Sequence, residues 1–393
     1  MKWLRNILDN IAPTFEKGGK LEKFYPVFEA TDTILFSTDK RTESGPHIRD
    51  SIDVKRVMIL VVVSLIPCYI FGAMNVGYQS ALAMGLTATW QENLMNGTLA
   101  ILPIIAVTFA SGAFWELLFA VVRKHPVSEG FLVTCALIPL VMPATIPLWQ
   151  VAVATSFGIV IGKEIFGGVG MNIFNPALVA RAFLFFTYPG HISGDKVWVA
   201  GPDGYSGATA LAVPAAEKSQ DAVTLLDSMT QFDYSWTNMF MGWVPGSIGE
   251  TSTFFILVSA LFLAFIGIAS WRIMMGALIG MTGMAVLTNF MAEAMGSSNT
   301  MLTLPAHYHL VMGGFAFGVA FMATEPVTGA HTDKGRWVYG LFIGALTVII
   351  RSINPAYPEG TMLAILLMNA FAPLIDYFVV RSNIKKRMAR YAQ

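Results

Sequence analysis

The segment 203–209, Asp-Gly-Tyr-Ser-Gly-Ala-Thr, holds the residues of this chain best suited to carry an attached group. Thr209 supplies a hydroxyl after a small glycine-containing turn, and Asp203 supplies a carboxylate six residues upstream. These are the parts needed to present a side-chain oxygen to a modifying enzyme. The alternative is a surface turn at 201–204, because Gly, Pro and Asp are typical turn residues. Residues 204–208 are not the GxSxG elbow of hydrolases, since they end in Ala and lack the strand and helix that this motif requires.

Arg181 is a charged side chain inside an apolar run, residues 178–188. An arginine at such a position costs about 2.5–3.5 kcal/mol on insertion scales, so it should face a cavity or a partner. Two roles remain open for it. It pairs with a carbonyl or a carboxylate inside the bundle, or it places a cation beside an anionic or polar group.

Three carboxylates are similarly costly: Glu116, Glu325 and Asp376. An ionised carboxylate is a strong ligand for a hard cation, which prefers oxygen ligands. The alternative is an interfacial position or a pair with a basic side chain. Arg381 would allow such a pair for Asp376, because it follows about one helical turn later.

The composition indicates the class of protein. Hydrophobic residues make up 55% and charged residues 13% of the 393 residues, whereas ordinary globular proteins carry roughly 25% charged residues. The formal net charge is zero, which implies no nucleic-acid partner. Cys68 and Cys135 lie in apolar stretches without metal, haem or disulfide spacing. We therefore expect an all-α polytopic protein of the lipid bilayer, without a resident metal.

The sequence predicts ten transmembrane helices, because ten stretches approach the roughly 20 apolar residues that cross a bilayer. They cover residues 57–74, 99–122, 129–147, 149–166, 173–188, 252–270, 273–292, 308–324, 336–353 and 360–380. The third, fifth and eighth are short or interrupted by Pro and Gly, which predicts broken or re-entrant helices. The stretch 76–95 contains Asn, Gln and Glu, and we expect it to be an external connection.

Lys and Arg residues are unevenly shared between the two sides that these spans define. Ten of the 25 lie in residues 1–56 and five follow residue 380. When the loops are counted as well, 21 of the Lys and Arg residues lie on the side of the two termini and 3 on the opposite side, while Arg181 lies inside a span. The positive-inside rule then places both termini in the cytoplasm and the loop 189–251 outside.

The predicted organisation has five parts. They are a cytoplasmic N-terminal arm (1–56), a five-helix membrane half (57–188), a periplasmic loop (189–251), a second five-helix half (252–380) and a basic cytoplasmic tail (381–393). An odd number of spans per half makes the halves inverted relative to each other, as in transporters. This 5+5 inverted repeat is a hypothesis, because residues 141–147 only loosely echo residues 321–326.

Several motifs taken together resemble one family. They are residues 49–56, 122–131, 162–168, 175–178, 181–186 and the segment 203–209. From about residue 15 to the tail, the chain resembles NqrB, the B subunit of the bacterial sodium-translocating NADH:quinone oxidoreductase. The related RnfD subunits share the flavin motif and the spans but usually lack so long an N-terminal arm. The arm therefore favours NqrB.

The resemblance implies a covalent flavin. FMN would be joined through its phosphate to Thr209, in a motif completed by Asp203, Ser206, Gly207 and Ala208 and recognised by a flavin transferase. It further implies a non-covalent riboflavin, ubiquinone as substrate, and a place in a six-subunit complex beside the FMN-bearing C subunit. The implied location is the bacterial inner membrane.

The resemblance also suggests roles for smaller groups of residues. Arg181 would be a cation near reduced flavin, and Asn175 an amide at the ring edge, although Asn175 before Pro176 equally fits a helix cap. In the family, a pair of Gly residues associated with quinone stands at the positions of Gly112 and Ala113. In this chain the second position of the pair is Ala. Small residues at that point also serve helix packing.

The predicted function is that of a membrane subunit of a redox-driven sodium pump. It passes electrons from NADH through covalent FMN and riboflavin to ubiquinone, coupled to sodium export, and acts only within the complex. Glu116, Glu325 and Asp376 are the candidate ion path, and no catalytic side chain is expected because the flavin ring does the electron chemistry. The rival is a cofactor-free secondary transporter or channel. Carboxylates and broken spans suit both, whereas the flavin motif and the basic arm suit only the pump.

Overall fold

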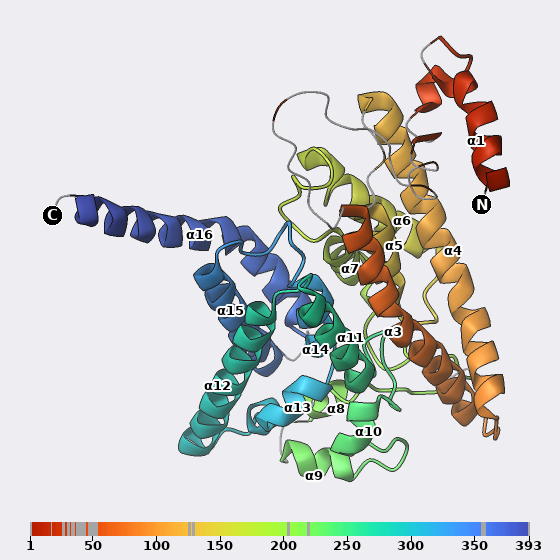
Figure 1. Ribbon diagram of the computed structural model, residues 1–393. Helices are drawn as coiled ribbons and strands as arrows, with labels where there is room; N and C mark the ends of the chain where they lie inside the picture. The colour runs from red at the N-terminus through yellow and green to blue at the C-terminus, as the bar shows by residue number, and fades with distance from the viewer. Residues whose placement is uncertain are drawn as a thin grey trace.

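The computed structural model describes residues 2–16, 18–25, 54–124, 130–202, 205–217, 221–354 and 359–391, with single positions 28, 29, 32, 36, 45 and 127. Within these residues the fold is helical throughout and holds no strand (Figure 1). The prediction of an all-α polytopic membrane protein is confirmed. Asp203 of the attachment motif lies outside the described residues.

The helices follow the predicted order. The N-terminal arm contributes α1 (Lys2–Phe15). The first half contains α3 (Val54–Ala83), α4 (Trp90–Arg123), α5 (Gly130–Leu140), α6 (Leu148–Val160) and α7 (Pro176–Thr187). The loop carries α8 (Ala212–Ala216), α9 (Ala222–Asp227) and α10 (Trp236–Met241). The second half contains α11 (Thr253–Ile266), α12 (Trp271–Met295), α13 (Ala306–Val311), α14 (Phe315–Phe317), α15 (Asp333–Ile353) and α16 (Thr361–Tyr391).

Among the described residues, six helices are long and apolar enough to cross a membrane, namely α3, α4, α12, α15, α16 and α6 with the turn after it. Helices α5, α7 and α11 are shorter, and the eighth predicted span is interrupted into α13, α14 and a π-helical segment, Gly318–Met322. These segments coincide with the ten predicted stretches. The third, fifth and eighth are short or broken as predicted, but the shortness of α11 was not anticipated.

The expectation that 76–95 is an external connection is wrong. Helix α3 continues to Ala83 and α4 begins at Trp90, so only residues 84–89 join them. The polar residues that suggested a loop have partners: the Asn75 side chain donates to the Val244 carbonyl oxygen at 3.0 Å, and Glu92 completes a capping box at the start of α4. A polar composition here marks two helix ends.

Broken helices in a bilayer need partners for their free backbone groups, because no water is available there. At the end of α5, the carbonyl oxygens of Leu140 and Met142 accept from the backbone N–H groups of Gly249 and Ile248, at 2.7 and 3.1 Å. The segment just before α11 therefore completes the hydrogen bonding of α5. This contact joins the loop to the first half.

Some helix contacts recur in the two halves, although α3 packs extensively on α4 and α11 does not pack in this way on α12, so the inverted repeat stays a prediction. Helix α4 packs on α6 and α6 on α7, as α12 packs on α15 and α15 on α16. Between the halves, the two first helices, α3 and α11, touch, and so do the two last helices, α7 and α16. Equivalent helices meeting across an interface are the pattern expected of a two-fold relation.

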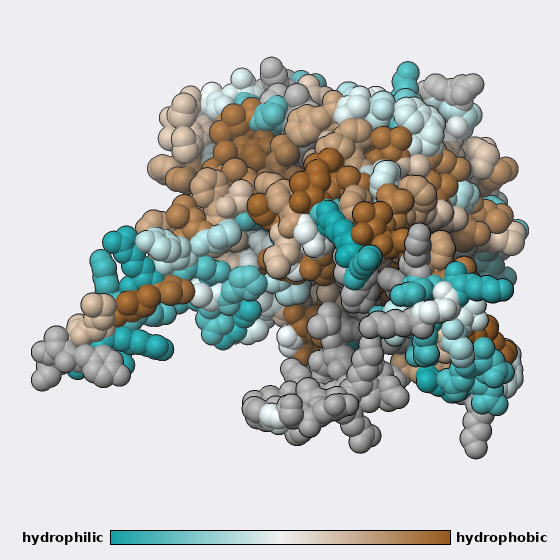
Figure 2. Space-filling view, turned by 90° about the horizontal axis from the view of Figure 1, so that it is seen from above, coloured by the Kyte–Doolittle hydropathy of each residue, from teal (hydrophilic) through white to brown (hydrophobic). Residues whose placement is uncertain are grey.

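The surface separates lipid-facing from water-facing parts. Large apolar side chains such as Phe265, Leu261 and Phe290 are exposed on the bundle. Figure 2 shows hydrophobic residues across the bundle, and hydrophilic residues gathered on the two projecting elements, α1 and the end of α16. The bundle surface is thus suited to lipid, whereas the two projecting elements carry both polar and exposed apolar side chains, among them Trp3 and Ile7 of α1 and Met388 of α16.

Candidate functional site

Two cavities lie along α7. Asn175 caps the start of this helix and lines one cavity, while Arg181 in its middle lines the other. Six residues of α-helix rise about 9 Å, so the two cavities approach each other closely along α7. We name them the Asn175 cavity and the Thr209 cavity.

The Thr209 cavity has an empty volume of about 860 Å³. Its wall combines helix α7, the loop that contains Thr209, and the connections before α11 and α16, with Arg181, Trp198, Thr209, Glu250, Met312 and Glu359 among its lining residues. Segments far apart in the sequence therefore build it together. Thr209 is half-buried, and its hydroxyl oxygen accepts a hydrogen bond from the Ala212 backbone N–H at 3.3 Å.

The turn that presents Thr209 is held by its backbone. The Ser206 carbonyl oxygen accepts from the Gln231 amide, and the Ala208 carbonyl oxygen accepts from the Tyr234 hydroxyl, both at 2.6 Å. Gly207 is required by a close approach, because a Cβ at this position would lie 2.6 Å from Cγ2 of Val199. The described motif residues, 205–209, are thus held by hydrogen bonds to residues 231 and 234 and by close packing on Val199.

Arg181 pairs with two carboxylates. Its Nη1 donates to Glu250 Oε1 and its Nη2 to Glu359 Oε2, both at 2.5 Å. Gly314 lies beside both acids, since a Cβ there would collide with an oxygen of each carboxylate. Of the two roles considered for Arg181, pairing within the bundle is therefore present, and the guanidinium also lines the Thr209 cavity.

The sequence analysis missed both partners of Arg181, and it missed the burial of Arg351. Arg351 is fully buried and donates to the carbonyl oxygens of His309, Met312 and Glu359, at 2.8, 2.8 and 3.0 Å. It thereby holds the break after α13 against the start of α16. The only available signal was a charged residue next to a predicted span end, which is also the ordinary position of a surface residue.

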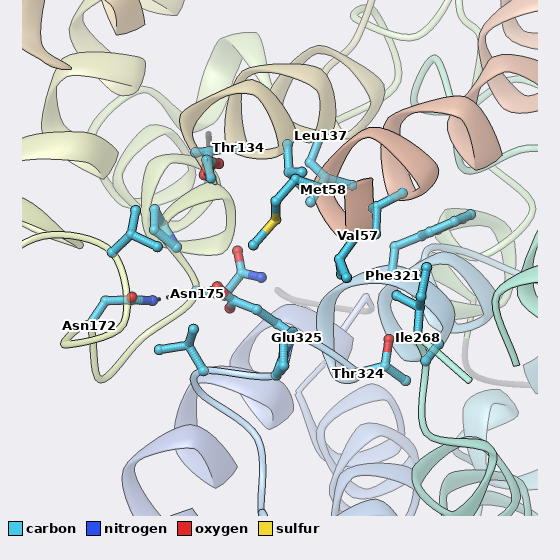
Figure 3. A pocket seen from close by; sticks show the side chains of 18 of the residues that line it. Val57, Met58, Thr134, Leu137, Asn172, Asn175, Ile268, Phe321, Thr324 and Glu325 are labelled. Atoms are coloured by element: carbon cyan, nitrogen blue, oxygen red, sulfur yellow. Dashed lines mark hydrogen bonds between the residues drawn. The ribbon is translucent and has the colours of Figure 1, made fainter. Parts of the chain in front are cut away.

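The Asn175 cavity has an empty volume of about 780 Å³ and is lined by apolar residues with a few polar groups. Figure 3 shows Asn172, Asn175 and Glu325 close together on one side, with Met58 and Leu137 above them and Phe321 to one side. The Glu325 carboxylate accepts from the Thr328 hydroxyl at 2.8 Å and from the Asn172 amide at 3.5 Å.

Asn175 serves as the cap of α7. Its side-chain oxygen accepts from the backbone N–H groups of Ala177 and Leu178, at 3.0 and 3.2 Å. The cap interpretation of the Asn-Pro pair is therefore correct, and Pro176 stands at the first position of the helix, where a missing N–H costs nothing. The same residue also lines the cavity, so the capping role and a ligand-binding role are compatible.

Glu116 has a basic partner. The Lys163 ammonium donates to Glu116 Oε2 and lies 3.3 Å from Glu164 Oε1, while Arg123 lies 3.2 Å from Glu164 Oε2. Lys163, Glu116 and Glu164 are each 1% exposed. Neither Lys163 nor Glu164 was among the candidate residues predicted from the sequence. The structure buries them and joins them to Glu116.

The remaining candidates are placed as follows. Asp376 accepts from the backbone N–H groups of His331 and Thr332, at 2.7 and 3.0 Å, and so ties α16 to the start of α15. Gly112 is buried against α5, where a Cβ would collide with Sγ of Cys135. Its absent side chain therefore permits helix packing, as does the small, half-buried Ala113.

The three carboxylates predicted as an ion path are not gathered into one site. Glu116 lies with Lys163, Glu325 lies with Asn172, and Asp376 lies at the start of α15. Over the part of the chain that the structure describes, no group of three or more His, Cys, Asp or Glu side chains could hold a metal ion.

These features define a multi-pass membrane protein with one cavity toward each end of a short central helix, and with a threonine presented into one of them. A family model described as the NQR2, RnfD, RnfE family matches residues 41–385. The chain belongs to this family.

Curated relatives resemble the chain over nearly its whole length. The B subunit of the Na(+)-translocating NADH-quinone reductase of Chromohalobacter salexigens is 51% identical over 99% of this chain and 97% of its own. The proteins of the same name from Yersinia pestis and Pseudomonas aeruginosa are each 46% identical over 98% of this chain and 99% of their own.

Proposed function

We propose that this chain is the membrane-embedded B-type subunit of a sodium-translocating NADH–quinone reductase, the complex for which its relatives are named. It would act only with its companion subunits, among them the FMN-bearing C subunit of a six-subunit assembly. The near-complete coverage of both chains supports this proposal over the rival, a cofactor-free secondary transporter or channel.

The observation that carries the flavin part of the proposal is the position of Thr209. The motif threonine lines a cavity whose wall brings together segments far apart in the sequence, among them Arg181 of α7 and Glu359 before α16. A concave, mainly apolar pocket with a few polar groups is typical of a ligand site. The residues present fit an FMN joined through its phosphate to Thr209, because its hydroxyl has one hydrogen-bond donor and open space beside it. Arg181 would offer a cation near the ring.

The Asn175 cavity is the proposed seat of the non-covalent riboflavin. Its apolar wall would exclude water, while Asn172, Asn175 and Thr134 offer amide and hydroxyl groups to the edge of a flat ring. When bound, the two flavins would supply the electron chemistry between NADH and ubiquinone. Helix α7 would hold the two seats at a short, fixed separation.

We propose the orientation of the chain in the membrane from the distribution of its Lys and Arg residues. The loop 189–251 would lie in the periplasm, where a flavin transferase reaches Thr209, and both termini would lie in the cytoplasm of a bacterial inner membrane. A topology reporter fused after Pro202 should be active only outside, and reporters at Arg123, Lys334 and the C-terminus only inside. A cytoplasmic reporter signal after Pro202 would contradict this arrangement.

The ion path is proposed to involve Glu116, Glu325 and Asp376 in separate places, rather than as one site. Glu116 and Glu325 support a role in handling sodium, since each stands beside the Asn175 cavity or in its wall. Asp376 would act more weakly, because its oxygens already accept backbone N–H groups. For Gly112 and Ala113, packing accounts for the small side chains, and quinone contact stays a proposal.

Thr209→Val tests the flavin proposal. The change keeps the shape and removes the hydroxyl, so the complex should assemble but the denatured subunit should lose its flavin fluorescence. Thr209→Ser should keep part of it, and Ser206→Ala and Asp203→Ala should lower it less completely. Thr237→Val in α10 is a matched control in the same loop, outside the cavity lining. Persistent fluorescence in Thr209→Val would show that the assigned residue is wrong.

A further inference from the structure

One buried lysine stands between an anionic pair and the Asn175 cavity. The Lys163 ammonium donates to Glu116 and lies 3.3 Å from Glu164. On its other side, Lys163 lines the Asn175 cavity, and among the described residues it is the sole cation that does so. One mobile positive charge therefore touches two carboxylates and an adjacent ligand site.

Among the described residues, the ion pairs of this cluster join two cations to two carboxylates. Lys163 and Arg123 offset Glu116 and Glu164, and Arg123 occupies the outer position with a side chain 36% exposed. In a poorly screened interior, a new negative charge in the cavity would attract the nearest cation that can move. Arg123 is held at the far side of Glu164, so Lys163 is the cation in position to respond.

The backbone allows this movement. Helix α6 ends at Val160, and Lys163 lies in the turn before the short 3-10 segment Glu164–Phe166. Its ammonium sits on a flexible four-carbon stem with donors that can rotate, unlike the planar fork of an arginine. The side chain can thus exchange one set of acceptors for another without disturbing a helix.

We propose that the Lys163 ammonium is an internal cation that sodium replaces. While the Asn175 cavity holds an oxidised redox group, Lys163 neutralises Glu116 and Glu164. When an electron supplied by NADH reaches that group, Lys163 turns its ammonium toward the cavity, and the two carboxylates take up one sodium ion. One electron and one cation enter together, so charge balances. The inference rests on the proposed redox occupant of the cavity and adds how this chain couples it to sodium.

Equilibrium binding of radioactive sodium to the purified, NADH-free complex tests the proposal without turnover. Lys163→Met removes the competitor and should tighten sodium binding by about tenfold or more, because Glu116 and Glu164 then lose the buried cation that they share. Lys163→Arg should weaken binding, since a guanidinium holds carboxylates in a bidentate fork. Lys196→Met, an exposed lysine of the loop, should leave binding unchanged.

A redox titration of the non-covalent flavin is the second measurement. Its midpoint potential should rise with sodium in the wild-type complex and lose that dependence in Lys163→Met. If the Lys163→Met complex does not assemble, the sodium affinity of the Lys163→Arg complex tests the proposal instead, and it should be weaker than that of the wild type. Wild-type sodium binding in the assembled variants would overturn the proposal, as would a Lys163→Met complex that takes up protons in place of sodium. Absence of flavin from the wild-type complex would instead refute the proposed function, while the sodium-binding results would remain interpretable.

Discussion

At one end of α7, the Thr209 cavity carries Arg181 between two carboxylates, Glu250 and Glu359. At the start of this helix, the Asn175 cavity has a mainly apolar wall, with Glu325 bound to neutral donors and with Lys163 paired to Glu116 and Glu164. The first arrangement joins the two halves of the chain by an ion pair, whereas the ion pairs of Lys163 stay within the first half.

This difference has a structural consequence. Arg181 belongs to the last helix of the first half, and Glu359 precedes the last helix of the second half, so their ion pair closes the Thr209 end across the interface between the halves. The Asn175 end has no ion pair of this kind in its lining among the described residues. We infer that the Thr209 end is the fixed end and that the Asn175 end rearranges at lower cost.

The largest expected effect comes from Arg181→Gln. Removing one partner of a buried ion pair costs about 3–5 kcal/mol, because the opposite charges stay buried and unpaired. The yield and thermal stability of the complex should fall sharply. Glu325→Gln, in the other cavity, should change stability by less than about 1 kcal/mol, since the amide keeps polar contacts there. Equal losses in the two variants would remove the distinction between the cavities.

Gly207→Ala should have the next largest effect. The new Cβ would lie 2.6 Å from Cγ2 of Val199, and overpacking of this kind costs about 1–3 kcal/mol. The displaced turn should present Thr209 poorly, so covalent flavin should decrease. Adding Val199→Ala should restore it, which the fluorescence of the denatured subunit would measure. Gly190→Ala is the matched control, because open space surrounds that position. Unaltered flavin content in Gly207→Ala would mean that the turn is not rigid.

The smallest effect is expected for Asn175. Asn175→Ala removes the cap of α7 and should cost about 1 kcal/mol, measured as a lower melting temperature. Asn175→Asp keeps the capping oxygen but not the amide N–H groups. We expect both variants to lose the non-covalent flavin and only the alanine variant to lose stability. This result would show that the amide binds the ligand independently of its capping role. If Asn175→Asp retains its flavin, the amide does not contact it.

The sequence predicted the features that depend on local composition. Apolar runs of sufficient length fixed the class and the ten segments, and the Asn-Pro pair predicted the start of α7. It failed at 76–95, where polar residues at helix ends were taken for a loop. The Val244 carbonyl that accepts from Asn75 lies 169 residues away and leaves no local signal, whereas the capping box of Glu92 with Thr89 is a local signal that was not recognised.

The sequence by itself determined that this chain is a membrane protein and that Arg181 and Glu116 need partners, and it predicts an attachment motif at Thr209. Each follows from a residue type in its immediate surroundings. Only the tertiary structure decided which partners they have, because Glu359 is 178 residues from Arg181 and Lys163 is 47 from Glu116. A buried charge requires compensation wherever the fold can supply it, and the fold alone brings distant segments within hydrogen-bonding reach.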